Sequence, residues 1–137
     1  MDDLKTQIES LAGMVALAML ALAPAATVAA LTVTDQTGRT VTLAAAPRRI
    51  VSLVPGVTEM LFVIGAEERL IGVTDFCDFP AAARRKHRVG SMLAPSLETV
   101  VALHPYLVVA TDSGNSDETR VQLARLHGEA PLAVVLG

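Results

Sequence analysis

Cysteine is nearly absent from this chain of 137 residues, in which Cys77 is the only one. A single cysteine cannot form an internal disulfide, and it excludes zinc sites that are built on paired cysteines. Tryptophan is absent and aromatic residues make up 3% of the chain, so few side chains are available to stack on a ligand. Cys77 is therefore predicted to be a free thiol, and the few aromatic residues become the first candidates for ligand contact.

Positively charged residues are fewer than negatively charged ones, which gives a formal net charge of −3 at pH 7. The densest basic cluster, at residues 84–88, is short and lacks interleaved aromatic residues, so a solvated face is favoured over a nucleic-acid interface. Apolar residues are abundant at 52%, against 18% charged residues, which excludes a disordered chain. The length suits one domain, and we expect a monomer with no nucleic-acid partner.

The N-terminal segment has the pattern of a secretory signal peptide over residues 1–30. An uncharged apolar run at 11–23 is followed by Pro24 and small residues at 25–30. This run is shorter than the roughly 20 apolar residues of a membrane span. The opening residues 1–5 carry more acid than base, unlike most export signals, which leaves a misassigned start codon, an uncleaved anchor or a cytoplasmic helix as alternatives. We expect a cleaved signal and a freely diffusing product that begins near Leu31.

The remainder alternates predicted strands and helices. Alternating residues at 31–34 and 40–43, with turn residues between them, predict a β-hairpin. Short apolar runs predict buried strands at 49–53, 70–73, 107–110 and 132–136. Helices are expected at 58–64, 96–103 and 115–127. This order predicts an α/β fold, in which a Rossmann-like parallel sheet carries helices on both faces and follows an N-terminal hairpin.

Capping residues define the expected helix ends. Pro55-Gly56 is interpreted as a turn before the first helix, and Gly65 as the residue that closes it. Ser96 is predicted to cap the second helix, and His104-Pro105 to stop it. Asn115, with Glu118 three residues on, is predicted to form a capping box for the third.

The order of several short motifs resembles a known family. These motifs are Arg-Ile-Val-Ser-Leu at 49–53, Thr-Glu-Met-Leu-Phe at 58–62, Asp-Phe-Cys-Asp-Phe-Pro at 75–80, Ser-Leu-Glu at 96–98 and Ala-Leu-His-Pro at 102–105. Together they resemble the periplasmic cobalamin- and siderophore-binding proteins, the helical-backbone metal receptors of ABC importers. The resemblance covers roughly residues 31–137.

The resemblance implies a two-lobed protein in which a long helix joins the lobes and the ligand lies between them. Residues 31–137 would form the N-terminal lobe, truncated before that helix and the second lobe. The implied function is capture of a metal chelate in the periplasm and delivery to an ABC permease at the inner membrane. The cargo would be a corrinoid such as cobalamin, with a ferric siderophore or haem as the alternative, and no cofactor is expected. A non-functional truncated remnant is a further alternative.

Ligands of an open α/β sheet bind beyond the carboxyl ends of the strands. This rule selects the loops at 55–57, 74–80, 90–95 and 112–115, which match cleft-lining segments of the family. The predicted ligand-binding residues are Pro55, Gly56, Phe76, Met92 and Ser113. Phe76 matches an aromatic residue that packs on cobalamin in the family, although it could instead be a buried loop anchor. Phe79 is expected to pack inward, and axial contact of Cys77 with a bound metal is a remote alternative.

Charged residues suggest two further expectations. Glu98 lies in the first turn of a helix, where a carboxylate stabilises the helix dipole; the resemblance implies instead that it docks against arginines of the permease. Glu59 is a weaker docking candidate. An anionic siderophore would require a cluster of arginines facing the cleft, for which Arg84, Arg85 and Arg88 are the candidates.

Catalytic and metal-ligating patterns do not emerge from the sequence. His87, His104 and His127 lack the spacing of metal ligands, and the nucleophile-elbow, phosphate-loop and dinucleotide-binding motifs are absent. Nothing orders Ser52, Asp75 and His104 into a triad. The protein is therefore predicted not to be an enzyme and to have no metal site of its own.

Overall fold

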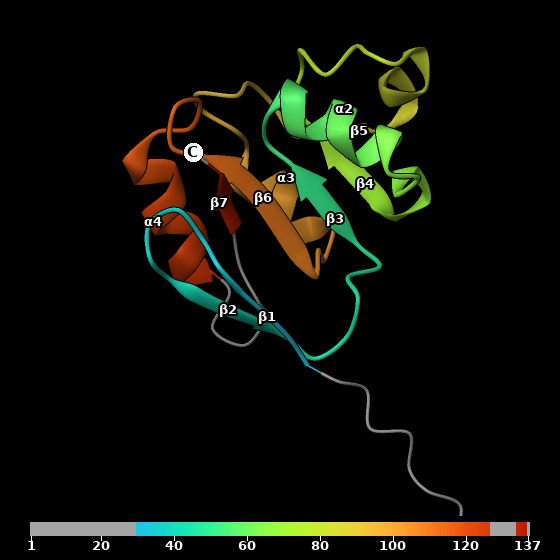
Figure 1. The fold of residues 1–137 in the computed structure, drawn as a ribbon. Helices are drawn as coiled ribbons and strands as arrows, with labels where there is room; N and C mark the ends of the chain where they lie inside the picture. The colour runs from blue at the N-terminus through green and yellow to red at the C-terminus, as the bar shows by residue number, and fades with distance from the viewer. Residues whose placement is uncertain (1–29, 127–133, 137) are drawn as a thin grey trace, which may run out of the picture.

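The computed structural model describes residues 30–126 and 134–136 (Figure 1). The predicted signal peptide therefore lies, apart from its last residue, outside the described residues. Within the described ranges, no helix combines the length and the apolar character needed to cross a membrane.

Strands and helices follow one another in nearly the predicted order. The elements are β1 (Leu31–Thr34), β2 (Thr40–Leu43), β3 (Ile50–Ser52), α2 (Pro55–Val63), the 3-10 helix η1 (Glu67–Arg69), β4 (Leu70–Val73), the 3-10 helix η2 (Ala81–Arg85), β5 (His87–Arg88), α3 (Leu97–Ala102), β6 (Leu107–Thr111), α4 (Asp117–Leu126) and β7 (Val134–Leu136). The sequence did not indicate η1 or β5, because each is too short to show a period.

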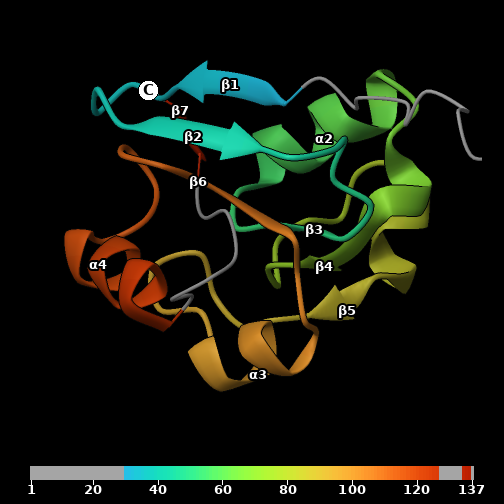
Figure 2. The same ribbon diagram turned by 90° about the horizontal axis from the view of Figure 1, so that it is seen from below.

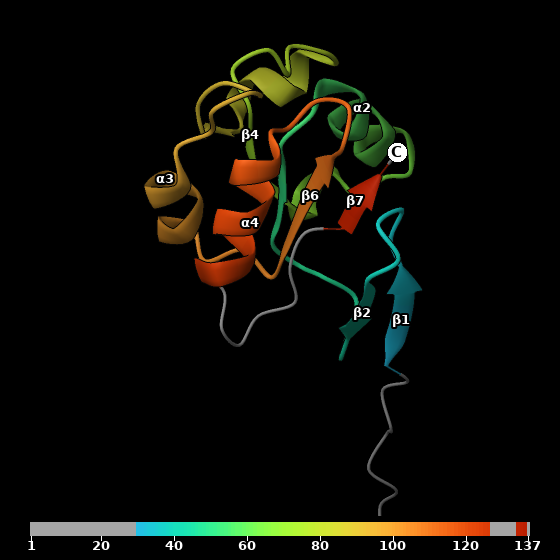
Figure 3. The ribbon, with the colours of Figure 1, turned by 90° about the vertical axis from the view of Figure 1, so that its left-hand side faces the viewer.

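The central sheet has five strands in the order β5-β4-β3-β6-β7. Each neighbouring pair is parallel, which confirms the predicted parallel sheet. Figure 3 shows β6 and β7 running in the same direction. Because all strands are parallel, their carboxyl ends meet at one edge of the sheet. We call the loops that leave β3, β4, β5 and β6 the carboxyl edge.

Two layers cover the sheet, one on each face (Figure 2). Alternate residues of β3 point to opposite layers: Ile50 packs with α2 and the hairpin, whereas Val51 packs with α3 and α4. In β6, Val109 and Val108 divide in the same way. This alternation follows from the two-residue period of a strand. The predicted sheet with helices on both faces is therefore confirmed.

The hairpin β1–β2 is antiparallel and pairs Leu31 with Leu43. Its turn is closed by Asp35, whose Oδ1 accepts hydrogen bonds from the Thr37 N–H at 3.0 Å, the Thr37 hydroxyl at 2.7 Å and the Arg39 N–H at 2.8 Å. Burial alone raises the pKa of the Asp35 carboxyl. The hydrogen bonds, with the charge of Arg39, outweigh that effect and hold the pKa below its usual value.

Helix α2 begins earlier than predicted. Pro55 occupies the start of the helix rather than a turn before it, so the interpretation of Pro55-Gly56 as a turn is wrong. Proline suits this position because the first N–H groups of a helix have no intrahelical partner. Gly65 follows the helix with φ +73°, as the prediction of a closing glycine requires.

The caps of α3 and α4 differ in how well they were predicted. Ser96 caps α3, since its Oγ accepts from the Thr99 N–H at 3.2 Å, as predicted. At α4, Ser116 accepts from the Thr119 N–H at 3.1 Å. The predicted capping box at Asn115 is wrong, because the Asn115 side chain is bonded to other loops, as described below.

Candidate ligand-binding edge of the sheet

Phe76 stands on the loop that follows β4, at the carboxyl edge. Its side chain is 72% exposed. A buried loop anchor, the alternative for this residue, is thereby contradicted. Phe79 on the same loop is also 69% exposed, so the expectation that it packs inward is wrong. The loop therefore presents two aromatic side chains to its surroundings.

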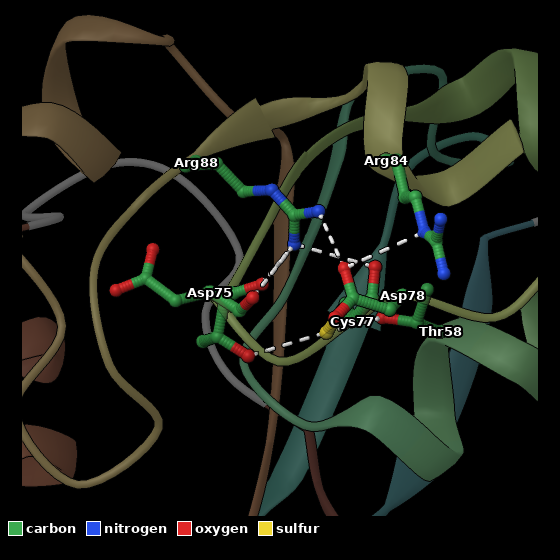
Figure 4. A network of polar contacts seen from close by, with 7 residues as sticks. Thr58, Asp75, Cys77, Asp78, Arg84 and Arg88 are labelled. Atoms are coloured by element: carbon green, nitrogen blue, oxygen red, sulfur yellow. Dashed lines mark hydrogen bonds and ion pairs between the residues drawn. The ribbon is translucent and has the colours of Figure 1, made fainter. Parts of the chain in front are cut away.

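The guanidinium of Arg88 holds this loop from β5 (Figure 4). Its Nη1 donates to the backbone carbonyls of Thr74 at 2.7 Å, Asp75 at 3.2 Å and Cys77 at 3.3 Å. Its Nη2 donates to Asp78 Oδ1 at 3.0 Å. One side chain thus binds four residues of the turn that carries Phe76.

Cys77 anchors the same turn from below. It is a free thiol with 1% exposure, which confirms the predicted free state. Hydroxyl groups of Thr58 and Thr74 lie 3.2 Å from its Sγ, and Thr58 Oγ1 also donates to Ser52 Oγ at 3.0 Å. Because the thiol is enclosed, the remote alternative of axial contact with a bound metal is wrong.

Met92 is half-buried and rests against the loop that follows β6. A Cβ built on Gly114 would lie 3.1 Å from Met92 Sδ and 2.8 Å from Thr111 Oγ1, so only glycine allows this approach. Part of the Met92 side chain remains accessible as a polarisable apolar surface.

Asn115 joins three loops of the edge. Its Nδ2 donates to the carbonyls of Met92 at 2.6 Å and Leu53 at 3.3 Å, and its Oδ1 accepts from the Thr111 N–H at 3.0 Å. The residue is only 4% exposed. It fixes the loops after β3, β5 and β6 relative to one another.

The remaining predicted ligand-binding residues also lie on these loops. Pro55 is half-buried and Gly56 is exposed, both at the N-terminal end of α2, while Ser113 is exposed after β6. Sequence reasoning missed Arg88 and Asn115 as organisers of the edge. Their partners are mostly backbone carbonyls of distant segments, which leave no signal in the sequence.

Charged side chains of both signs lie on and next to the Phe76 loop. Asp75 is exposed on this loop, and its side chain points away from the Arg88 network in Figure 4, whereas Asp112 is exposed on the separate loop after β6. Arg88 is engaged by Asp78, and the Arg84 Nε lies 3.9 Å from the same carboxylate. Arg85 lines a separate pocket with Phe62 and Glu67. The structure therefore does not gather the three candidate arginines into one anion-binding cluster.

The two docking candidates lie on different layers. Glu98 is exposed in the first turn of α3, whereas Glu59 is exposed on α2, beyond its first turn and across the sheet. Beside Glu98, an open groove of about 710 Å³ runs between α3 and α4. Leu97, Val101 and Arg125 contribute to its lining. The groove is formed by the sides of helices and not by the loops of the carboxyl edge.

Metal-ligating groups are not clustered in the described part of the chain, where no set of three His, Cys, Asp or Glu residues is arranged to hold an ion. His87 is exposed on β5, and His104 follows α3 with φ +46°. His127 lies outside the described residues. The candidate site is therefore a surface of loops with aromatic, thioether and carboxylate groups.

An open parallel sheet with loops gathered at one edge is the architecture of ligand-binding α/β proteins. The sequence model of the family described as "Periplasmic binding protein" matches residues 50–130. This match spans more than half of the chain, from β3 past the end of α4. The chain therefore belongs to the periplasmic binding protein family.

Curated relatives carry one recurring description. The chain is 39% identical over 80 residues to the vitamin B12-binding protein of Pectobacterium carotovorum, a match that covers 58% of this chain and 29% of that protein. It is 37% identical over 76 residues to the vitamin B12-binding protein of Vibrio vulnificus, covering 55% and 28%. The matched region is thus less than a third of each relative.

Solved structures extend the similarity to a second kind of ligand. The vitamin B12-binding protein of Vibrio cholerae matches with a TM-score of 0.58 and 28% identity, over 63% of this chain and 33% of that one. The periplasmic haem-binding protein of a Roseiflexus species matches with a TM-score of 0.59 and 28% identity, over 66% and 34%. These matches confirm the predicted fold and family.

Proposed function

We propose that this chain supplies part of the cargo site of an ABC importer's substrate-binding protein, and that its cargo is a corrinoid such as cobalamin. It acts by binding and not by catalysis, and it works in the periplasm after export. Cargo contacts the carboxyl edge through Phe76 and Met92, flanked by Pro55, Gly56 and Ser113. The observation that carries the proposal is the exposed ring of Phe76 on a firmly held loop of a chain in this family.

Charge favours a corrinoid over an anionic chelate. An anionic siderophore needs cations at its contact surface, because desolvating a carboxylate without a partner is costly. At the Phe76 loop, Asp78 already pairs with Arg88 and Arg84, while the exposed Asp75 adds negative charge. A large and mostly neutral ligand that packs on apolar side chains suits this surface better.

A second candidate is haem or a ferric siderophore. It is supported by the similarity to the haem-binding Roseiflexus protein, which matches at the same level of identity as the B12-binding structure. Haem differs from a corrinoid in charge, because haem carries two propionates. Salt and pH dependence of binding therefore distinguish them.

Equilibrium dialysis of the chain against cyanocobalamin, haem and a ferric siderophore tests the cargo. We expect saturable binding of cyanocobalamin that Phe76→Ala weakens and Phe79→Ala leaves nearly unchanged. Saturable binding of haem alone would support the second candidate. Failure of all three to bind would contradict both proposals.

Delivery of the cargo is proposed to use Glu98. The carboxylate is exposed on α3, beside the groove between α3 and α4, so it is free to meet an arginine of a permease at the inner membrane. Glu59 is a weaker candidate on the opposite layer.

Stimulation of the permease ATPase in proteoliposomes tests this role. Glu98→Gln should lower stimulation and leave cargo affinity unchanged, whereas Glu118→Gln, an exposed carboxylate on α4, serves as the matched control. Equal stimulation by Glu98→Gln and the control would rule out docking through Glu98.

A further inference from the structure

We propose that Arg88 is a positioning residue for Phe76. It fixes the orientation in which the Phe76 ring contacts the cargo. The cargo part of this inference rests on the function proposed above. Arg88 does not touch the cargo; it acts through the loop after β4. The structural basis is the set of bonds from a single guanidinium to the residues on both sides of Phe76.

The bonds of Arg88 enclose Phe76 in the sequence. Nη1 reaches the carbonyls of Thr74 and Asp75 before the ring and of Cys77 after it, and Nη2 reaches Asp78. Hydrogen bonds from a charged donor are stronger than those between neutral groups. The planar fork of arginine allows one side chain to hold several acceptors in a fixed arrangement, which lysine cannot reproduce.

The exposure of the Phe76 ring explains why its loop needs an attachment such as Arg88. A 72% exposed aromatic ring gains little from packing, so burial holds its direction only weakly. Below the loop, the buried Cys77 thiol makes weak hydrogen bonds with the hydroxyl groups of Thr58 and Thr74. Arg88 supplies the stronger attachment on the upper side. A ring that is already held in position loses less conformational entropy when the cargo binds, and this preorganisation raises the affinity.

The neighbouring Arg84 provides a matched comparison. Its Nε lies 3.9 Å from Asp78 Oδ1 and its side chain is 67% exposed, against 30% for Arg88. An exposed pair at that distance contributes little. Arg84→Gln therefore removes the same charge from the same loop region without removing the bonds to the carbonyls.

A tryptophan at position 76 reports loop motion directly, because the chain contains no other tryptophan. In Phe76→Trp, time-resolved anisotropy should show a small nanosecond component. Adding Arg88→Gln should enlarge that component, whereas adding Arg84→Gln should not. If Arg88→Gln unfolds the chain by circular dichroism, Arg88→Lys replaces it and should give a change in the same direction.

Cargo affinity then tests whether Arg88 acts through the ring. With cyanocobalamin as the probe, Arg88→Gln should weaken binding roughly tenfold when Phe76 is present. In the Phe76→Ala background, the same substitution should weaken it by less than about twofold. A merely structural role would produce equal losses in both backgrounds and would overturn the inference.

The two measurements separate the two proposals. If no chelate binds, the proposed function fails while the anisotropy still decides whether Arg88 holds the loop. If anisotropy is the same for Arg88→Gln and Arg84→Gln, the positioning role is refuted whatever the cargo result.

Discussion

Asn115→Ala is expected to be the most damaging single truncation at the carboxyl edge. The substitution removes hydrogen bonds to Met92, Leu53 and Thr111 from a side chain with 4% exposure. Each such bond contributes about 1 kcal/mol net, so the expected loss in the free energy of unfolding is about 3 kcal/mol. For a domain of this size, that loss lowers Tm by roughly 15 °C.

Urea denaturation followed by circular dichroism measures the loss. Asp112→Ala, on the same loop but exposed, is the matched control and should change stability by less than about 0.5 kcal/mol. A loss for Asn115→Ala no greater than that of the control would show that Asn115 does not join the loops.

The Asn115→Asp variant adds a pH dependence to the same test. Its carboxylate would face the carbonyls of Leu53 and Met92, which raises its folded-state pKa above the unfolded value of about 3.9. The folded state then binds more protons, so stability relative to wild type is greatest below that value and is lost as pH rises through the folded pKa. A deficit that shrinks as pH rises would contradict the geometry.

Two further predictions concern the layers that support the edge. Gly72→Ala should lower the free energy of unfolding by about 1–3 kcal/mol in urea denaturation, because its Cβ would lie 3.2 Å from the fully buried Val51 Cγ2 and Val89 Cγ1, in addition to 2.8 Å from the flexible end of Leu103. Gly56→Ala, with nothing within 4 Å, should cost nothing, and equal effects would contradict the packing. The lowered pKa of Asp35 means that its stabilisation is fully present above the ordinary carboxyl pKa of about 3.8 and is lost as pH falls through the folded pKa. Thermal melts at falling pH should show a decline that Asp35→Asn reduces, and an identical decline in that variant would refute the role of the Asp35 turn.

The sheet and its layers were predictable because their residues obey local periods. β3 and β6 are apolar on both faces, and the alternation of the hairpin sequence appears as alternating burial in β2, although β1 is exposed throughout. Ser96 was recognisable as a cap since its partner is only three residues away. Such features are determined by neighbours in the sequence.

The roles of Asn115 and Arg88 were not predictable for the opposite reason. Asn115 bonds to Leu53, 62 residues away, and the sequence offered a closer partner in Glu118 that the structure does not use. Phe79, before Pro80, was expected to pack inward, but it is 69% exposed. Contacts with backbone carbonyls of other segments decide the roles of Asn115 and Arg88.

The structure separates two surfaces that the proposed function requires. The carboxyl edge carries Phe76 and Met92, and its loops are joined by side chains that do not themselves face outward. Glu98 lies on the outer helix layer beside an apolar groove. Substitutions at one surface should therefore leave the activity of the other unchanged, which makes cargo binding and delivery separable by mutation.

Chemical-shift mapping of the isotopically labelled chain with cyanocobalamin tests the central claim most directly. We expect the largest amide shifts at Phe76, Met92 and Ser113. Smaller shifts are expected at Gly56, the residue that follows Pro55. Phe76→Ala should reduce the shifts of the whole group. Shifts concentrated at Leu97 and Val101 in the groove between α3 and α4, or no shifts at saturating ligand, would contradict the assignment of the cargo to the carboxyl edge.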